Sequence, residues 1–109
     1  MQVLHSADHF GAEPGGEPHW VEHLSARDLS VGTYSLPAGS ADLQHPHSED
    51  EIYVVLAGHG ALATDTARVQ VGPGSVVNVP AAEPHRFVDV VEDVVALVVF
   101  APAEGTRAG

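Results

Sequence analysis

Apolar residues along the chain fall in short runs that alternate with polar residues or are bounded by glycine and proline, and no long stretch shows a helical period. Such runs, rich in valine and other β-branched or aromatic residues, are typical of β-strands. The pattern predicts strands at residues 19–24, 29–36, 42–47, 51–56, 60–65, 67–71, 75–80, 85–91 and 93–100. A chain of many short strands without helices is expected to form an all-β sandwich or barrel.

Domain organisation follows from the segments that separate or flank these runs. Residues 11–18, GAEPGGEP, gather glycine, proline and glutamate and cannot continue a helix or a central strand. A chain of 109 residues suits a single core. We therefore predict an N-terminal arm and loop at 1–18, one barrel domain at 19–102 and a flexible C-terminal tail at 103–109.

The run VVALVVF at 94–100 is apolar at consecutive positions, so both faces of this strand are expected to be buried. Either a second subunit covers its outer face, or the strand is the centre of a two-sheet core. Small barrels must also protect the exposed edges of their strands, and dimerisation is one way to do so. We therefore predict a homodimer.

Charge and composition exclude several classes of function. Fifteen acidic residues face four basic ones, a net charge of −11, so neither nucleic acid nor a membrane surface is an expected partner. The chain has no cysteine, and its basic residues are all arginines, which excludes thiolate and lysine-based covalent catalysis. No run approaches the roughly 20 apolar residues of a membrane span, so a cytoplasmic location is the default expectation.

The stretch HPHSEDE at 45–51 contains the residues that most directly indicate a function. In a strand, His45 and His47 project from the same face, and two neighbouring imidazoles favour a metal. Together with Glu51 and His85 they form a set of intermediate hardness, suited to transition metals rather than calcium or magnesium. Taken singly, the pair is more typical of a solvated strand, and His85 of a hydrogen-bonded core histidine. Glu49 shares the parity of Glu51 and is an alternative ligand.

Two segments resemble the conserved motifs of the cupin superfamily. Residues 39–58, GSADLQHPHSEDEIYVVLAG, fill every fixed position of the first motif, from Gly39 through His-x-His and Glu to Gly58. Residues 74–89, GSVVNVPAAEPHRFVD, resemble the second motif. There Gly74, Pro80 and His85 match, whereas Ala82 stands at the usual glycine and Asp89 at the usual asparagine. We expect Ala82 to form a turn without positive φ, and Asp89 to alter the polarity near the site.

The resemblance implies a small single-domain cupin with a double-stranded β-helix, a jelly-roll-like barrel. It also implies one divalent transition metal ion, Fe, Mn, Ni, Zn or Cu, held by His45, His47, Glu51 and His85. The family spacing favours Glu51 over Glu49 as the acidic ligand, which leaves Glu49 as a nearby acid.

Counting in twos from these residues predicts the walls of a pocket. Tyr53 and Val55 follow Glu51 on the inward face, and Phe87 and Asp89 follow His85. The predicted substrate pocket comprises Tyr53, Phe87, Tyr34 and Trp20. Filling of the core is an equally good explanation of the first two rings.

The remaining histidines are less informative. His19 and His23 flank Trp20 and either line the mouth of the barrel or face water. His59, in GHG, is expected to be exposed at a hairpin tip. His5 and His9 form either a weak metal pair or, as we favour, part of a mobile surface arm.

These features favour a metal-dependent cupin enzyme that acts on an oxygenated small molecule. The reaction is either an isomerisation, cyclisation or epimerisation, or Fe(II)-dependent dioxygen insertion. The alternative is a non-catalytic cupin that binds a small ligand or a metal. The sequence shows no attached DNA-binding or catalytic domain, which favours the enzyme.

Overall fold

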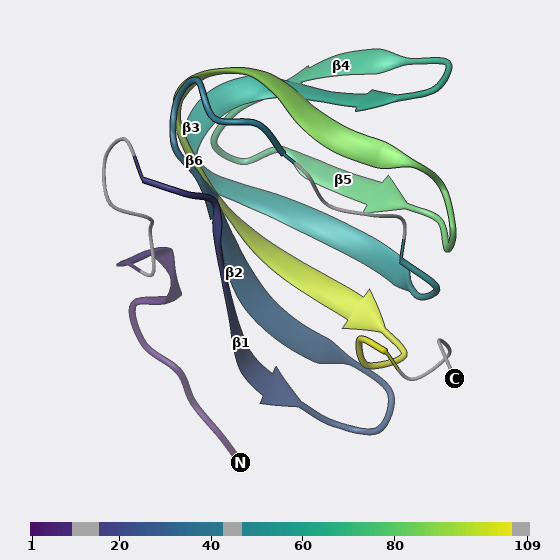
Figure 1. Cartoon of the computed structure of the whole chain (residues 1–109). Helices are drawn as coiled ribbons and strands as arrows, with labels where there is room; N and C mark the ends of the chain where they lie inside the picture. The colour runs from purple at the N-terminus through teal and green to yellow at the C-terminus, as the bar shows by residue number, and fades with distance from the viewer. Residues whose placement is uncertain (10–15, 43–46, 106–109) are drawn as a thin grey trace.

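The computed structural model describes residues 1–9, 16–42 and 47–105 (Figure 1). Its elements are the 3-10 turn η1 (Ala7–His9) and the strands β1 (His19–Ser25), β2 (Ser30–Leu36), β3 (Asp50–Thr64), β4 (Arg68–Val71), β5 (Val76–Val79) and β6 (His85–Ala101). Within these ranges no helix is long and apolar enough to cross a membrane. The prediction of an all-β chain is confirmed.

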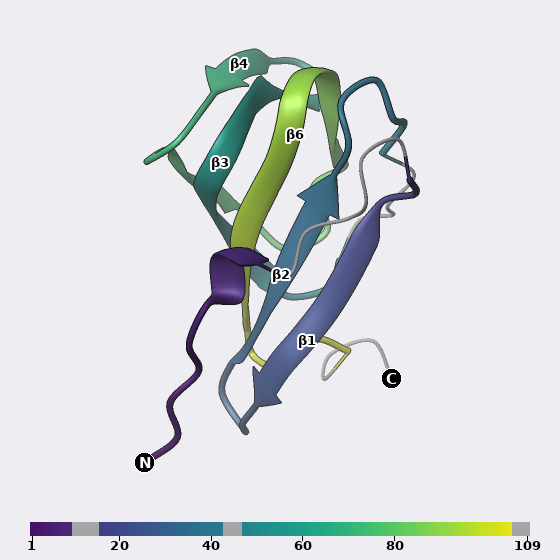
Figure 2. The same cartoon turned by 90° about the vertical axis from the view of Figure 1, so that its left-hand side faces the viewer.

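The strands form one antiparallel sheet in the order β1-β2-β6-β3-β4, with β5 added to β3. The two longest strands, β3 and β6, pair along nearly their whole length and bend together, so that the sheet curls back on itself (Figures 1 and 2). One half of β3 pairs with β5 and the other half with β4. This is the predicted double-stranded β-helix, built as a single small barrel.

The strands predicted at 51–56 and 60–65 form one bent strand, β3, and those predicted at 85–91 and 93–100 form another, β6. The ladder between β3 and β6 shifts register three times between Val55 and Ala61, and bulges of this kind bend a sheet. Gly58 lies in this region at φ 88°, where a Cβ would collide with the carbonyl of Asp93. His59 therefore lies within β3, not at a hairpin tip. Its side chain is exposed as predicted, with Nδ1 2.5 Å from Glu92 Oε1.

The predicted strand at 42–47 falls mostly on residues 43–46, which are outside the described residues. Asp42 and His47, at its two ends, do not lie in a strand. The carboxylate of Asp42 accepts a hydrogen bond of 2.8 Å from the backbone N–H of Phe87, a contact that strand pairing would have made through the backbone.

The inward face of the curled sheet holds the core. Its buried members are Leu36, Tyr53, Val55, Leu62, Val71, Val79, Phe87, Val90, Val94, Ala96, Val98 and Phe100. The outward residues of β6, Val95, Leu97 and Val99, are half-buried, whereas Ile52 and Val76 are exposed by 40% and 68%. Apolar residues thus occupy both faces of β6, as expected, but the outer face is only partly covered.

The chain ends pack on the barrel at two points. The Thr33 hydroxyl, on the outer face of β2, donates to the Ala7 carbonyl of η1 and lies 2.6 Å from His23 Nε2. His23 therefore faces outward. At the other end Ala103 is buried, and the Glu104 N–H donates to the Ser30 hydroxyl. The predicted C-terminal tail thus begins with two residues that contact the barrel, and the flexibility of 103–109 stays a prediction.

Two non-glycine residues of the second motif have positive φ. Ala82 lies at φ 65°, so the expectation of a turn without positive φ is wrong. Its N–H donates to the His47 carbonyl at 2.6 Å, and the preceding N–H of Ala81 donates to the Asp50 carboxylate at 2.9 Å, so two contacts fix this conformation. Asp89 lies at φ 48° beside the bulges. The bulges exchange the inward and outward positions of β6 after Phe87. Asp89 is therefore exposed and paired with Arg68, not directed inward.

The backbone of Ala82 generates a stability prediction. A non-glycine residue in the left-handed region costs about 1–2 kcal/mol, and the extra freedom that glycine has in the unfolded chain offsets about 0.4–1 kcal/mol of any gain. We expect Ala82→Gly to raise the free energy of unfolding by about 0.5–1 kcal/mol. Thermal denaturation monitored by circular dichroism measures the change.

Ala81→Gly is the matched control, because Ala81 is adjacent and has no positive φ. It should lower the stability by about 0.5–1 kcal/mol. Equal destabilisation by the two substitutions would contradict the role assigned to the conformation of Ala82.

Candidate metal centre and pocket

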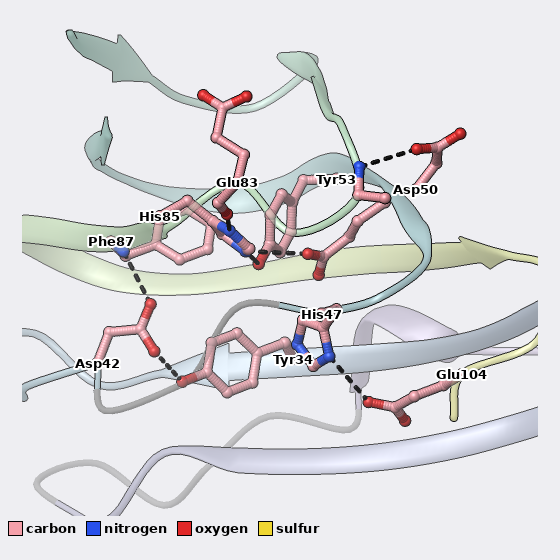
Figure 3. Close-up of polar contacts among 11 residues, drawn as sticks. Tyr34, Asp42, His47, Asp50, Tyr53, Glu83, His85, Phe87 and Glu104 are labelled. Atoms are coloured by element: carbon pink, nitrogen blue, oxygen red, sulfur yellow. Dashed lines mark hydrogen bonds and ion pairs between the residues drawn. The ribbon is translucent and has the colours of Figure 1, made fainter. Parts of the chain in front are cut away.

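The candidate centre lies where the ends of β3 and β6 meet. Glu51 is the second residue of β3, and His85 is the first residue of β6. Both side chains are almost fully buried, and Glu51 Oε1 lies 2.9 Å from His85 Nε2. Figure 3 shows His47 across from His85. His45 lies outside the described residues.

The hydrogen bonds of His85 define its tautomer. Nδ1 lies 2.8 Å from the Glu83 carbonyl, so this nitrogen donates, and Nε2 of the neutral ring presents its lone pair. The Tyr53 hydroxyl, 3.0 Å from Nε2, donates to it (Figure 3). His85 Nε2 is thus directed toward the interior, where a metal ion would replace the Tyr53 hydroxyl as the partner of its electron pair.

The carboxylate of Glu51 has a buried oxygen atom that lacks a hydrogen-bond partner among the described residues. Oε1 is buried without a hydrogen bond, although it lies 2.9 Å from His85 Nε2, because the contact lacks hydrogen-bond alignment. Two electron-pair donors therefore converge with no proton placed between them. A buried carboxylate without a partner is costly, and either a proton on His85 or a cation would compensate it.

The charge state of His85 reflects this contact. Burial disfavours the imidazolium form, but the Glu51 carboxylate, the Glu83 carbonyl and the charge of Asp42 outweigh it and raise the pKa of His85 above 6.5. The neighbouring Glu51 carboxylate therefore favours the protonated form of His85. A metal ion that binds here has to displace this proton.

His47 completes the described part of the centre. Its ring centre lies 6.2 Å from that of His85 and 4.7 Å from that of Phe100. Two imidazoles bound to one ion at about 2.1 Å and at tetrahedral or octahedral angles have ring centres roughly 5 Å apart, so His47 has to move toward His85 for the two to share a metal. His47 Nδ1 lies 3.6 Å from Glu104 Oε2, which directs Nε2 away from Glu104.

The structure thus brings together part of the predicted ligand set. Glu51 contacts His85, and His47 lies across from them; among residues 1–9, 16–42 and 47–105 no group of three such side chains is close enough to hold a metal without rearrangement. Glu49 is buried as well and accepts a hydrogen bond from the Ser48 hydroxyl at 2.6 Å. The complete set of four also depends on His45, which stays a prediction.

A cavity of about 190 Å³ adjoins the centre. Its lining residues are Trp20, Tyr34, His47, Glu51, Tyr53, Val98, Phe100 and Glu104. Three of the four predicted pocket residues are therefore placed on its wall. Phe87 is not; it lies behind Tyr53 in an edge-to-face contact, with ring centres 5.1 Å apart, and is buried in the core.

Two functional candidates were missed in the sequence. Glu104 reaches the cavity because the chain after β6 turns back onto β2, and burial together with Glu22, Glu49 and Glu51 raises its pKa against the opposing effect of His47. Asp42 accepts hydrogen bonds from the Tyr34 hydroxyl and the Phe87 N–H, which joins the segment before His45 to β2 and β6. The only available signal for Asp42 was an acid close to the histidine pair.

Tyr34 is held on the cavity wall by this contact. Burial, reinforced by the hydrogen bond to Asp42 and by the nearby acids, raises the pKa of Tyr34 above its usual value of 10.0. Its phenol therefore stays protonated and donates its hydrogen bond to Asp42 at 2.7 Å. The wall beside the centre is a fixed, neutral aromatic surface.

Known proteins share this architecture. A solved structure of a conserved protein with a double-stranded β-helix domain from Klebsiella pneumoniae superposes with a TM-score of 0.82 at 19% identity, covering 100% of this chain and 95% of that one. An RmlC-like cupin from Desulfovibrio desulfuricans gives a TM-score of 0.79 at 21% identity, covering 94% and 99%. At these identities the likeness shows the fold alone.

The sequence comparisons identify the family. An uncharacterized protein of Streptomyces coelicolor is 45% identical over 85 residues, which are 78% of this chain and 81% of the relative. The family model described as a cupin domain matches residues 32–100, which include both motifs and the described candidate ligands. The chain therefore belongs to the cupin family.

Proposed function

We propose that this cupin binds one divalent transition metal ion and is an enzyme acting on a small oxygenated molecule. The observation that carries the proposal is the buried contact between Glu51 Oε1 and His85 Nε2, 2.9 Å apart and without an aligned hydrogen bond. A metal ion would satisfy both donors at once. The proposed ligands are His45, His47, Glu51 and His85.

The donor set also limits the metal. Neutral imidazole and carboxylate suit Fe, Mn, Ni, Zn or Cu, and the absence of cysteine in the sequence removes soft thiolate sites. Four protein ligands would leave room for a substrate oxygen atom. When bound, the metal would supply Lewis-acid activation of a carbonyl or enol or, as iron, activation of dioxygen.

Residues of the cavity support catalysis rather than mere storage. Isomerisation, cyclisation and epimerisation each require a proton to be moved, and Glu104 Oε2 lies on the wall beside His47. Burial and the nearby acids Glu22, Glu49 and Glu51 raise the pKa of Glu104 against the effect of His47, and a raised pKa is the direction that favours a carboxyl group as a proton donor. A binder that only stores a metal has no need of such a group.

Removal of His85 tests the metal site. We expect untagged wild type, purified without added metal, to contain nearly one equivalent of transition metal by plasma mass spectrometry. Loss of an outer partner of a ligand alone weakens binding roughly 10–100-fold, so His85→Ala should lower metal affinity by at least about 100-fold. His59→Ala is the control, because His59 is exposed and paired with Glu92. Equal metal content in His85→Ala and wild type would refute the site.

The raised pKa of His85 predicts how metal affinity depends on pH. Because the metal has to displace the proton, apparent affinity should fall about tenfold per pH unit below the raised pKa and level off above it. The decline should begin at a pH higher than an unperturbed histidine would give. Competition with a chelator from pH 5 to 9 measures the profile, and a flat profile across pH 6–8 would contradict it.

The metal-free protein should show the opposite trend in stability. A pKa raised on folding stabilises the fold fully below 6.5, the unfolded value, and this contribution is lost as pH rises through the raised value. The midpoint of thermal unfolding should therefore decrease above pH 6.5 without metal and not with it. His85→Ala should remove the difference in slope.

We also propose that the protein is a homodimer joined by the outer face of the sheet. Ile52, Leu56 and Val76 are exposed there beside the half-buried outward residues of β6. Light scattering should give twice the chain mass of 11.4 kDa, and Ile52→Glu should reduce it to one chain. Val69→Glu, at an exposed valine of β4, is the control. A wild-type mass of a single chain would overturn the proposal.

A further inference from the structure

We infer that the pocket selects a ligand of about one ring without a phosphate group, and that it rejects phosphorylated ligands. The inference rests on the proposed metal site and adds the class of molecule that the site accepts. Three properties of the cavity carry it: its aromatic walls, its size and the sign of its charges.

Aromatic rings form most of the wall. Trp20, Tyr34, Tyr53 and Phe100 line the cavity together with Val98. The rings of Trp20 and Phe100 meet edge to face, with centres 6.0 Å apart, and the Asp42 hydrogen bond holds Tyr34 in place. Such surfaces stabilise a flat ring or an apolar ring face by packing, and they offer little to an extended polar chain.

The size of the cavity limits the ligand to about one ring. Its volume is about 190 Å³, whereas roughly 150 Å³ is enough to bind benzene. A six-membered ring with a few substituents therefore fits. A nucleotide or a disaccharide would have to extend well beyond the walls.

The charges of the lining are negative. Glu51 and Glu104 face the cavity, and the further acids Glu22 and Glu49 add to the negative potential at Glu104. A divalent ion at the proposed site would balance the first two carboxylates and leave no net positive charge for an anion. A dianionic phosphate would thus be buried without a counter-charge, which is unfavourable.

Lysine, arginine and helix N-termini, which are common phosphate-binding groups, are absent from the described part of the cavity. The sequence has no lysine, and Arg27, Arg68 and Arg86 are exposed and do not line it; Arg68 is paired with Asp89. The described elements near it are strands, so no helix N-terminus points into it. Arg107 is outside the described residues and enters the test as a variant.

The test uses catechol and glucose 6-phosphate as probes. Catechol is an uncharged ring with two adjacent oxygens at neutral pH, and glucose 6-phosphate is a ring of similar size that carries phosphate. Zinc is loaded first and its content measured, so that failure to bind zinc counts against the proposed function and not against this inference. Trp20, the single tryptophan of the chain, reports binding by fluorescence, with calorimetry as a second readout.

We expect catechol to bind the zinc-loaded protein at least tenfold more tightly than glucose 6-phosphate. Glu104→Arg should raise the affinity for glucose 6-phosphate at least tenfold, because it places a cation on the wall. Glu92→Arg is the matched control, with the same change in net charge at an exposed position, and should leave both affinities unchanged.

Several results would overturn the inference. Tighter binding of glucose 6-phosphate than of catechol, or binding of neither by zinc-loaded wild type, would each do so. Phosphate binding that disappears in Arg107→Ala would show that this arginine supplies the missing cation, which also contradicts the inference. The wild-type comparison decides the matter even if Glu104→Arg does not fold.

Discussion

The buried contact between Glu51 and His85 is the constraint on which the rest of this structure depends. Along the sheet, Glu51 pairs with Phe100 at one end of the β3–β6 ladder, and His85 pairs with Thr64 at the other. The two side chains can meet only because both strands bend back on themselves. A flat sheet with the same pairing would hold them far apart. Closure of the barrel and assembly of the donor pair are therefore one event.

The bend depends on backbone conformations that few residues tolerate. Gly58 provides one, since any side chain there would strike the carbonyl of Asp93, and Asp89 provides another on the facing strand. A third lies in the turn at Ala82, whose N–H holds the His47 carbonyl while the nearby Glu83 carbonyl holds the His85 ring. One short turn thus positions two of the candidate ligands, and strain at Ala82 is retained because its contacts fix it.

The sequence was informative where a pattern has one physical meaning. Alternation of apolar residues predicted the strands, and the resemblance of residues 39–58 and 74–89 to the cupin motifs implied the curled barrel. Counting by twos failed at Asp89 because a bulge adds residues that alternation does not reveal. The separate strands predicted around His59 failed for a related reason: glycines typical of a hairpin also permit a bend within one strand. Glu104 was missed since its position depends on a hydrogen bond to Ser30, a contact distant in sequence.

The position of Glu104 is a feature of this chain that the family motifs do not determine. The motifs place Glu51, His85 and His47 around the candidate centre, and any cupin with the same motifs would share them. The wall is made by residues outside those motifs or between their fixed positions: Trp20 from β1, Tyr34 from β2 and Glu104 from the end of the chain. Because the metal-facing donors carry no preference between a neutral and a phosphorylated ligand, the wall must supply it. The inferred source of that preference is the charge of the carboxylate at position 104, which lies on the wall beside His47.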